Sequence, residues 1–154
     1  MRYAVGEPLV KFEDEWKRIK QLGHYGSFTF AGTANEWRST VAAHFETSPL
    51  QGPCYGVYVV WQRATDKVIY IGKSGTMCQD GSFKNQGLAK RLVNREKGQM
   101  RQVIFGERVE KYGELLIEYV VPKDSSMIPG YLEARLLQAY YDEHNQLPPD
   151  NASL

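Results

Sequence analysis

Cysteine and histidine are scarce in this chain of 154 residues, which has two of the first and three of the second. Two cysteines cannot form a disulfide framework or a four-thiolate zinc site, and three widely spaced histidines argue against a histidine metal site. Long apolar runs are also missing, since no segment approaches the roughly 20 residues that span a bilayer. The first residues lack the pattern of a signal peptide. We therefore expect a protein of the reducing cytoplasm that makes no use of a membrane.

Net charge is nearly absent as well, at +1, but it is unevenly distributed along the chain. Residues 1–61 are neutral, residues 62–111 carry a net charge of +6, and residues 112–154 carry −5. A basic segment can attract a polyanion, and an acidic segment can hold a divalent cation. Segregation of this size also arises by chance in small domains, so the pattern alone leaves both interpretations open.

The remaining composition is that of an ordinary folded domain. Hydrophobic residues make up 42% of the chain and charged residues 24%, which excludes disorder as the main state. A chain of this length buries roughly 68–70% of the surface that its unfolded state exposes. We therefore expect a real hydrophobic core without disulfide or metal staples.

Residues 1–55 are predicted to be mainly helical. Apolar side chains recur at helical spacing from Phe12 to Leu22, and an alternating, strand-like segment follows at 24–30. Thr33 begins a capping-box pattern at the start of a second helix. We interpret this part as an N-terminal extension that packs on a second domain, formed by residues 56–154.

Residues 56–154 are predicted to form strand, strand, helix, strand and helix, in that order. The elements are expected at 56–62, 68–72, 88–97 and 114–121, and from Pro129 onward. This order predicts an α/β fold of the α+β kind, with a small three-stranded antiparallel sheet flanked by helices. The N-terminal helical extension would pack beside it.

Two tripeptides mark the expected hairpin, Gly56-Val57-Tyr58 and Tyr70-Ile71-Gly72. Either one alone is a weak signal, because tyrosine, valine and isoleucine are simply good strand formers. They are followed, in order, by Arg91, Glu133 and Asn151. This order of residues, from Gly56 to Asn151, resembles the GIY-YIG nuclease family.

The resemblance implies a metal-dependent DNA endonuclease. It implies hydrolysis of a phosphodiester bond with one metal ion, Mg²⁺ or Mn²⁺, leaving 5′-phosphate and 3′-hydroxyl ends. Glu133 is then the metal ligand, and its carboxylate is the hard oxygen donor that suits Mg²⁺. The alternative is that Glu133 merely favours a helix N-terminus. Within the family, a separate chain of this kind looks most like a restriction-type or mobile-element endonuclease.

Four further residues complete the catalytic set that the resemblance implies. Arg91 presents a planar fork that fits two phosphate oxygens, or else lies on a solvated helix face. Tyr58 is the candidate base or water-positioning group, and Tyr70 would hydrogen-bond the water or the phosphate; both could instead be ordinary sheet packing. A tyrosine pKa near 10 makes a poor base, and the Lys73 ammonium or a nearby Mg²⁺ would favour the phenolate.

The sequence departs from the family pattern at Arg95, where a histidine or tyrosine is usual. A guanidinium cannot accept a proton, so Arg95 is assigned to phosphate binding instead. The long loop at 74–87 is a second departure, and it could follow a DNA groove or be a surface insertion. Asn145 is the alternative to Asn151 as the family asparagine. The expected DNA contacts are Lys84, Asn85, Lys90, Arg95 and Asn151.

The hairpin offers a geometric test of the resemblance. Tyr58 and Tyr70 are both even-numbered, so they share a face only if paired residues have an even index sum, as when Tyr58 lies opposite Gly72. The turn lacks the signal of a two-residue loop. We therefore predict a loop of three or five residues, or a bulge, with both tyrosine hydroxyls facing Arg91 and Glu133.

Two other functions stay open from the sequence alone. One is a nucleic-acid-binding module that does not cleave, which Arg95 motivates. The other is a protein-interaction domain with a degenerate site, which the near-neutral net charge motivates. A DNA-binding protein should lose affinity steeply as salt rises, whereas an apolar interface should not.

Overall fold

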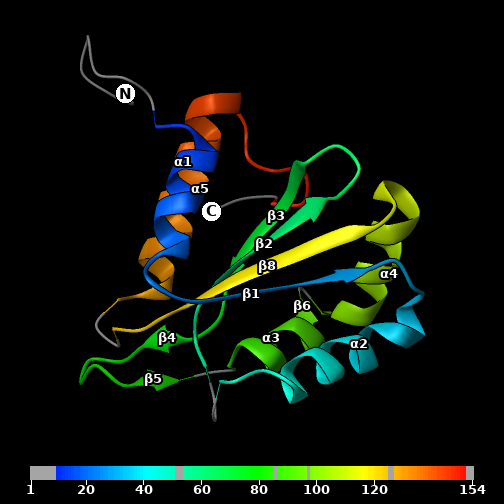
Figure 1. Cartoon of the computed structure of the whole chain (residues 1–154), viewed down its shortest axis with the longest axis horizontal. Coiled ribbons are helices and arrows are strands. Elements are labelled where there is room, and N and C mark those ends of the chain that lie inside the picture. The colour runs from blue at the N-terminus through cyan, green and yellow to red at the C-terminus, as the bar shows by residue number, and fades with distance from the viewer. Residues whose placement is uncertain (1–9, 51–53, 85–86, 97, 125–126, 152–154) are drawn as a thin grey trace.

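The computed structural model describes residues 10–50, 54–84, 87–96, 98–124 and 127–151. These residues form five helices and a four-stranded antiparallel sheet with the strand order β1-β8-β2-β3 (Figure 1). The strands are β1 (Gly23–Phe30), β2 (Val57–Gln62), β3 (Lys67–Lys73) and β8 (Leu115–Pro122). The fold class is α+β, as the sequence predicted.

The sheet has one strand more than expected, and the N-terminal part of the chain supplies it. β1 pairs along its whole length with β8, from Gly23 opposite Pro122 to Phe30 opposite Leu115. The alternation at 24–30 was therefore a strand signal, and its partner is a strand some ninety residues further along the chain. The division of the chain at residue 55 stays a prediction, although both parts contribute to this one sheet.

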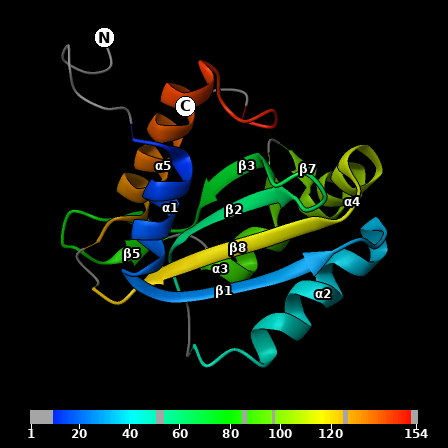
Figure 2. The same ribbon diagram turned by 45° about the horizontal axis from the view of Figure 1, so that its top comes forward.

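Helices cover both faces of the sheet (Figure 2). On one face lie α1 (Phe12–Lys20) and α5 (Pro129–His144), and on the other lie α2 (Ala34–Glu46), α3 (Leu88–Val93) and α4 (Arg101–Tyr112). Successive residues of a strand point to opposite faces. Val57 and Val59 therefore join the core under α1 and α5, whereas Tyr58 and Val60 join the core under the other three helices.

Local signals explain where several helices begin. α2 starts behind a capping box, in which the Glu36 carboxylate accepts a hydrogen bond from the Thr33 backbone N–H at 3.1 Å. α5 starts with Pro129 in its first turn, where a missing N–H costs nothing. None of the helices in the described ranges is long and apolar enough to cross a membrane.

Two helices differ from the sequence prediction. α3 ends at Val93 rather than at residue 97, and Arg95 lies instead in the short strand β6 (Arg95–Glu96), paired with β7 (Gln99–Met100). A turn at Gly98, with φ of 81°, allows this tight reversal. α4 was not predicted at all, because buried arginines interrupt its apolar face and disguise the periodicity.

The β2–β3 hairpin confirms the predicted register. Tyr58 pairs with Gly72 and Val60 with Tyr70, and the register then shifts so that Trp61 pairs with Val68. Ile69 is thus the extra residue of a β-bulge, and the loop has four residues, 63–66. The even index sum places both tyrosine rings on one face, with ring centroids 5.9 Å apart.

The loop at 74–87 contains a small ribbon of its own. β4 (Thr76–Met77) pairs with β5 (Phe83–Lys84). The Phe83 ring stacks on Tyr55, with centroids 5.0 Å apart, and this stack ties the ribbon to the chain just before β2.

Candidate active site

Three charged side chains from three different elements converge at one end of the β2–β3 hairpin. Lys73 is the last residue of β3, Arg91 lies on α3, and Glu133 lies near the start of α5. Burial raises the pKa of the Glu133 carboxyl, while the charges of Lys73 and Arg91 act in the opposite direction. Residues more than forty positions apart in the sequence are therefore brought within electrostatic reach of one another.

The Glu133 carboxylate lies in a partly buried setting near two cationic side chains. Burial, which penalises the charged form, outweighs the two cations, and so the pKa of Glu133 lies above its ordinary value. No hydrogen bond joins Glu133 to another residue in the described part of the chain. The Lys73 ammonium is partly committed elsewhere, since it donates to the Gly75 carbonyl at 3.1 Å. A desolvated carboxylate of this kind gains from a divalent cation.

A cavity of about 620 Å³ adjoins Lys73 and Arg91. Its lining residues are Lys73, Gly75, Thr76, Arg91, Asn94, Arg95 and Met100. Among the described residues that line it, three are cationic and none is acidic. The cavity therefore has the charge and the donors that suit an anion such as a phosphate group.

Arg91 has unused hydrogen-bonding capacity at this cavity. Its Nε atom is buried and has no hydrogen-bond partner among the described residues. A buried N–H without an acceptor costs about 1–3 kcal/mol, and such groups are rare in folded proteins. The guanidinium is thus a donor that a phosphate oxygen would satisfy.

The two hairpin tyrosines lie on the face that α3 and α4 cover. Tyr58 is only 1% exposed, and its ring lies over Gly72, where an added Cβ would come within 2.5 Å of the Tyr58 Cζ. Tyr70 is half-buried, and its ring lies beneath the Arg108 guanidinium. Gly72 is therefore required by the packing of Tyr58. The orientation of the two hydroxyls toward Arg91 and Glu133 stays a prediction.

The predicted DNA contacts differ in their surroundings. Lys84 on β5, Lys90 on α3 and Arg95 on β6 are exposed, and Arg95 also lines the cavity. The Arg95 guanidinium donates to the Gly98 carbonyl at 3.1 Å. Asn85 lies outside the described residues. These lysines and Arg95 can reach a polyanion, and their contact with DNA stays a prediction.

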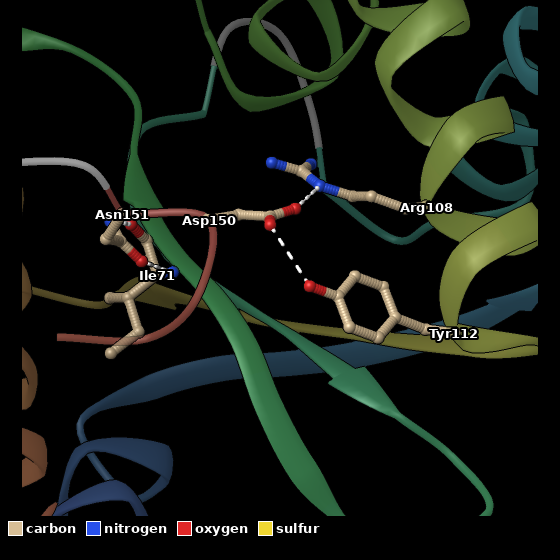
Figure 3. Close-up of polar contacts among 5 residues, drawn as sticks. All are labelled: Ile71, Arg108, Tyr112, Asp150 and Asn151. Atoms are coloured by element: carbon tan, nitrogen blue, oxygen red, sulfur yellow. Dashed lines mark hydrogen bonds and ion pairs between the residues drawn. The ribbon is translucent and has the colours of Figure 1, made fainter.

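Asn151 holds the C-terminal segment to the hairpin (Figure 3). Its Oδ1 accepts from the Ile71 N–H at 2.9 Å and its Nδ2 donates to the Ile71 carbonyl at 2.9 Å. The side chain thus pairs with β3 as a neighbouring strand would. Asn145 instead ends α5 in a left-handed conformation, with φ of 59°. Asn151 has a structural part in the site, and the DNA contact assigned to it stays a prediction.

Two buried arginines that sequence reasoning missed contact residues of the candidate site. Arg101 is 1% exposed and donates to the carbonyls of Asn94 and Arg95, at 3.3 and 2.9 Å. It thereby fixes the segment that lines the cavity beyond α3. Arg108 lies over Tyr70. No signal in the sequence distinguishes these two from arginines on a solvated helix face.

The chemistry of the donor groups restricts which metal the site can hold. No group of three or more histidine, cysteine, aspartate and glutamate residues that could hold a metal ion occurs within the described ranges. A zinc site is therefore not supported there. A single carboxylate fits Mg²⁺, which keeps several waters and takes further oxygen ligands from substrate phosphates. Glu133 is the candidate ligand for such an ion.

Comparison with protein-family models, with curated proteins and with solved structures gives no match to this chain.

Proposed function

We propose that this protein is a metal-dependent DNA endonuclease of the GIY-YIG type. The observation that carries the proposal is the electrostatic proximity of Glu133 to Lys73 and Arg91, two cations that line the cavity. The shared face of Tyr58 and Tyr70 supports it further. These residues come from β2, β3, α3 and α5, in the order that the sequence motif anticipates.

Each residue of this cluster has a role that its chemistry allows. Arg91 offers its guanidinium to a phosphate oxygen in the cavity and, with Lys73, balances the charge of the bound phosphodiester. Glu133 would hold Mg²⁺ or Mn²⁺, and a bound ion of this kind neutralises charge on the phosphate and makes water a better nucleophile. The Tyr70 phenol, at the bulge of β3, orients the attacking water or the phosphate.

The exposed cations extend the proposed binding surface beyond the cavity. Lys84, Lys90 and Arg95 would follow the phosphates on either side of the bond that is cleaved. We propose DNA as the substrate, hydrolysed to 5′-phosphate and 3′-hydroxyl ends in a restriction-type or mobile-element role. We also propose the reducing cytoplasm as its compartment, in keeping with the low cysteine content of the chain.

A second candidate function is nucleic-acid binding without cleavage. The burial of Tyr58, which is 1% exposed, favours it, because a buried phenol cannot easily reach an attacking water. Arg95 adds to this argument, since it provides charge for binding but no proton acceptor. The cavity would then bind a phosphate that is not hydrolysed.

Cleavage of supercoiled plasmid tests the proposal directly. The wild-type chain is incubated with plasmid and Mg²⁺, Mn²⁺ or EDTA, and nicked and linear forms are separated on a gel. Glu133→Gln is the test variant, and Glu143→Gln on the same helix is the matched control. We expect metal-dependent nicking by the wild type and the control only.

Binding measured in rising salt separates the remaining possibilities. Tight, salt-sensitive DNA binding without nicking in either metal would establish the non-cleaving module. Neither binding nor cleavage would contradict both functions and favour a protein-interaction domain.

A further inference from the structure

Arg108 on α4 is a buried arginine that has no role in the reaction proposed above. Its side chain is only 5% exposed, so it cannot serve as a surface contact to DNA. Its guanidinium carbon lies 4.7 Å from the centre of the Tyr70 ring and 4.8 Å from that of Phe105. Distances of this size are those of cation–π contacts, and the planar guanidinium therefore contacts the Tyr70 ring directly.

Asp150, near the C-terminus, fixes the Arg108 guanidinium (Figure 3). Arg108 Nε donates to Asp150 Oδ2 at 2.6 Å, and the Tyr112 hydroxyl donates to Asp150 Oδ1 at 3.3 Å. The two partners come from one helix, one turn apart. Asp150 is therefore held from two directions, and the guanidinium that it anchors has little freedom to turn.

The segment that carries Asp150 is attached to β3 at two successive residues. The Asp150 N–H donates to the Ile69 carbonyl at 3.0 Å, and the Asn151 side chain pairs with Ile71. The two contacted residues, Ile69 and Ile71, are the neighbours of Tyr70 along the chain. The C-terminal segment thus lies along the outer edge of β3, where Figure 3 shows the Asn151 side chain paired with Ile71.

The β-bulge explains why Tyr70 needs this support. Ile69 is the extra residue in β3, and the regular ladder to β2 is interrupted immediately before Tyr70. A bulge re-aims the neighbouring side chain and weakens the backbone constraint on its direction. Side-chain contacts must then determine where the Tyr70 phenol points, and Arg108 supplies the contact on its ring face.

We propose that Arg108 and Asp150 are positioning residues for Tyr70, through which docking of the C-terminal segment on β3 sets the geometry of the reaction site. This inference rests on the proposed function, because Tyr70 is a reacting-site residue only there. The proposal adds a requirement beyond the motif residues. Turnover would also depend on the segment after α5, which has no proposed contact with the metal or the phosphate.

The test uses the full chain labelled with 3-fluorotyrosine, so that each tyrosine gives a fluorine resonance. Tyr70→Phe assigns the Tyr70 resonance. The variants are Arg108→Met, Arg108→Lys and Asp150→Asn. The matched control is Arg63→Met, which also breaks an ion pair between an arginine and a carboxylate. This pair is exposed at the hairpin loop, where Arg63 Nη1 lies 3.1 Å from Glu114 Oε1.

We expect all three test variants to move the Tyr70 resonance, Arg108→Met most, and the control to leave it unchanged. Plasmid cleavage by Arg108→Met should lose up to about 10²-fold in kcat, because small displacements of a reacting group cost that much. KM should stay within about twofold, since the cavity cations that hold the phosphate are intact. Arg108→Lys should recover only part of the loss, because an ammonium does not replace the planar fork.

The two proposals fail in different ways. A wild-type chain that does not cleave overturns the proposed function, while the fluorine spectra still decide whether Arg108 and Asp150 hold Tyr70. An unmoved Tyr70 resonance in Arg108→Met and Asp150→Asn overturns the inference. So does a shift without any fall in kcat, in a wild type that cleaves. Thermal melting identifies any variant that does not fold, and the inference is then judged on Arg108→Lys and Asp150→Asn.

Discussion

Glu118 is buried and Glu133 is half-buried, and the two carboxylates differ in the partners around them. Glu118 on β8 is 7% exposed and accepts hydrogen bonds from Trp16 Nε1, at 3.0 Å, and from the Tyr25 hydroxyl. Burial and the contact with Glu118 raise the pKa of Tyr25 to about 12, so that Tyr25 stays a donor. Glu118 therefore belongs to a satisfied structural network.

Glu133 has the opposite arrangement. Its partners act through charge and not through hydrogen bonds, and burial raises the pKa of its carboxyl in spite of them. A structure that leaves a desolvated carboxylate in this state loses stability by it. We propose that Glu118 serves the fold, whereas Glu133 serves the proposed reaction. The following predictions test that division.

The largest effect should come from Glu133→Gln, which we expect to abolish plasmid cleavage while the fold is retained. Removing the carboxylate removes the candidate metal ligand and the charge relief that depends on it. Melting temperature with and without Mg²⁺ gives a second readout, since an ion that binds only the folded state stabilises it. Mg²⁺ should raise the melting temperature of the wild type and not of the variant. Cleavage by Glu133→Gln at the wild-type rate would remove Glu133 from the site.

The next largest effect should come from Arg91→Lys. We expect a fall in single-turnover cleavage of about 10²–10³-fold, by analogy with the loss of one oxyanion donor. The lysine keeps the charge but loses the Nε–H and the fork geometry. Arg63→Lys makes the same change at an exposed arginine of the hairpin loop, outside the proposed binding surface, and this control should cleave normally. Near-normal cleavage by Arg91→Lys would show that Arg91 is only a source of charge.

Glu118→Gln should have a moderate effect, and on stability alone. In the wild type, one carboxylate oxygen of Glu118 accepts from Trp16 and the other from Tyr25. The glutamine keeps one of these acceptors and replaces the other with an NH₂ donor. Loss of a buried, charge-assisted partner costs about 1–3 kcal/mol in the free energy of unfolding. Urea unfolding measures this loss, and cleavage by the folded variant should be unchanged. A large loss of cleavage in a folded Glu118→Gln variant would contradict the proposal that Glu118 serves only the fold.

The smallest effect should be the pH dependence of the stability difference between wild type and Glu133→Gln, both without metal. Because the folded-state pKa of Glu133 is raised, its ionisation destabilises the wild type as pH rises from the ordinary value of 4.5 through the folded-state pKa. Glu133→Gln should therefore be the more stable protein at pH 7, and the difference should vanish toward pH 4. Urea unfolding at several pH values measures it. The opposite sign would mean that a partner stabilises the ionised carboxylate of Glu133.

Much of the fold could be predicted from local patterns. The predictions relied on the strand signals at 56–62 and 68–72, the capping box at Thr33 and the proline at the start of α5. Each of these features describes residues that act on near neighbours. The index-sum argument also succeeded, because the alternation of side chains along strands is a property of the backbone. The residues of the candidate site were instead named from the resemblance of their order along the chain to the GIY-YIG family.

Other features could not be predicted from those patterns. α4 was missed because the side chains of Arg101 and Arg108, buried by contacts elsewhere in the fold, do not look apolar. The fourth strand was assigned to an extension because its partner, β8, is distant in the sequence. The helix after residue 88 was predicted too long, since the β6–β7 turn depends on one glycine and on contacts made by Arg101.

The sequence by itself determined the chemical groups and the elements that carry them, because strand alternation, capping and proline placement are short-range effects. Only the tertiary structure decided which groups meet. It brought Lys73, Arg91 and Glu133 together, left the Arg91 Nε without a partner in the described part of the chain, and raised the pKa of Glu133 by burial. It also placed Arg108 over Tyr70. Desolvation and electrostatic coupling depend on distances through space, and those distances exist only once the sheet and its helices have packed.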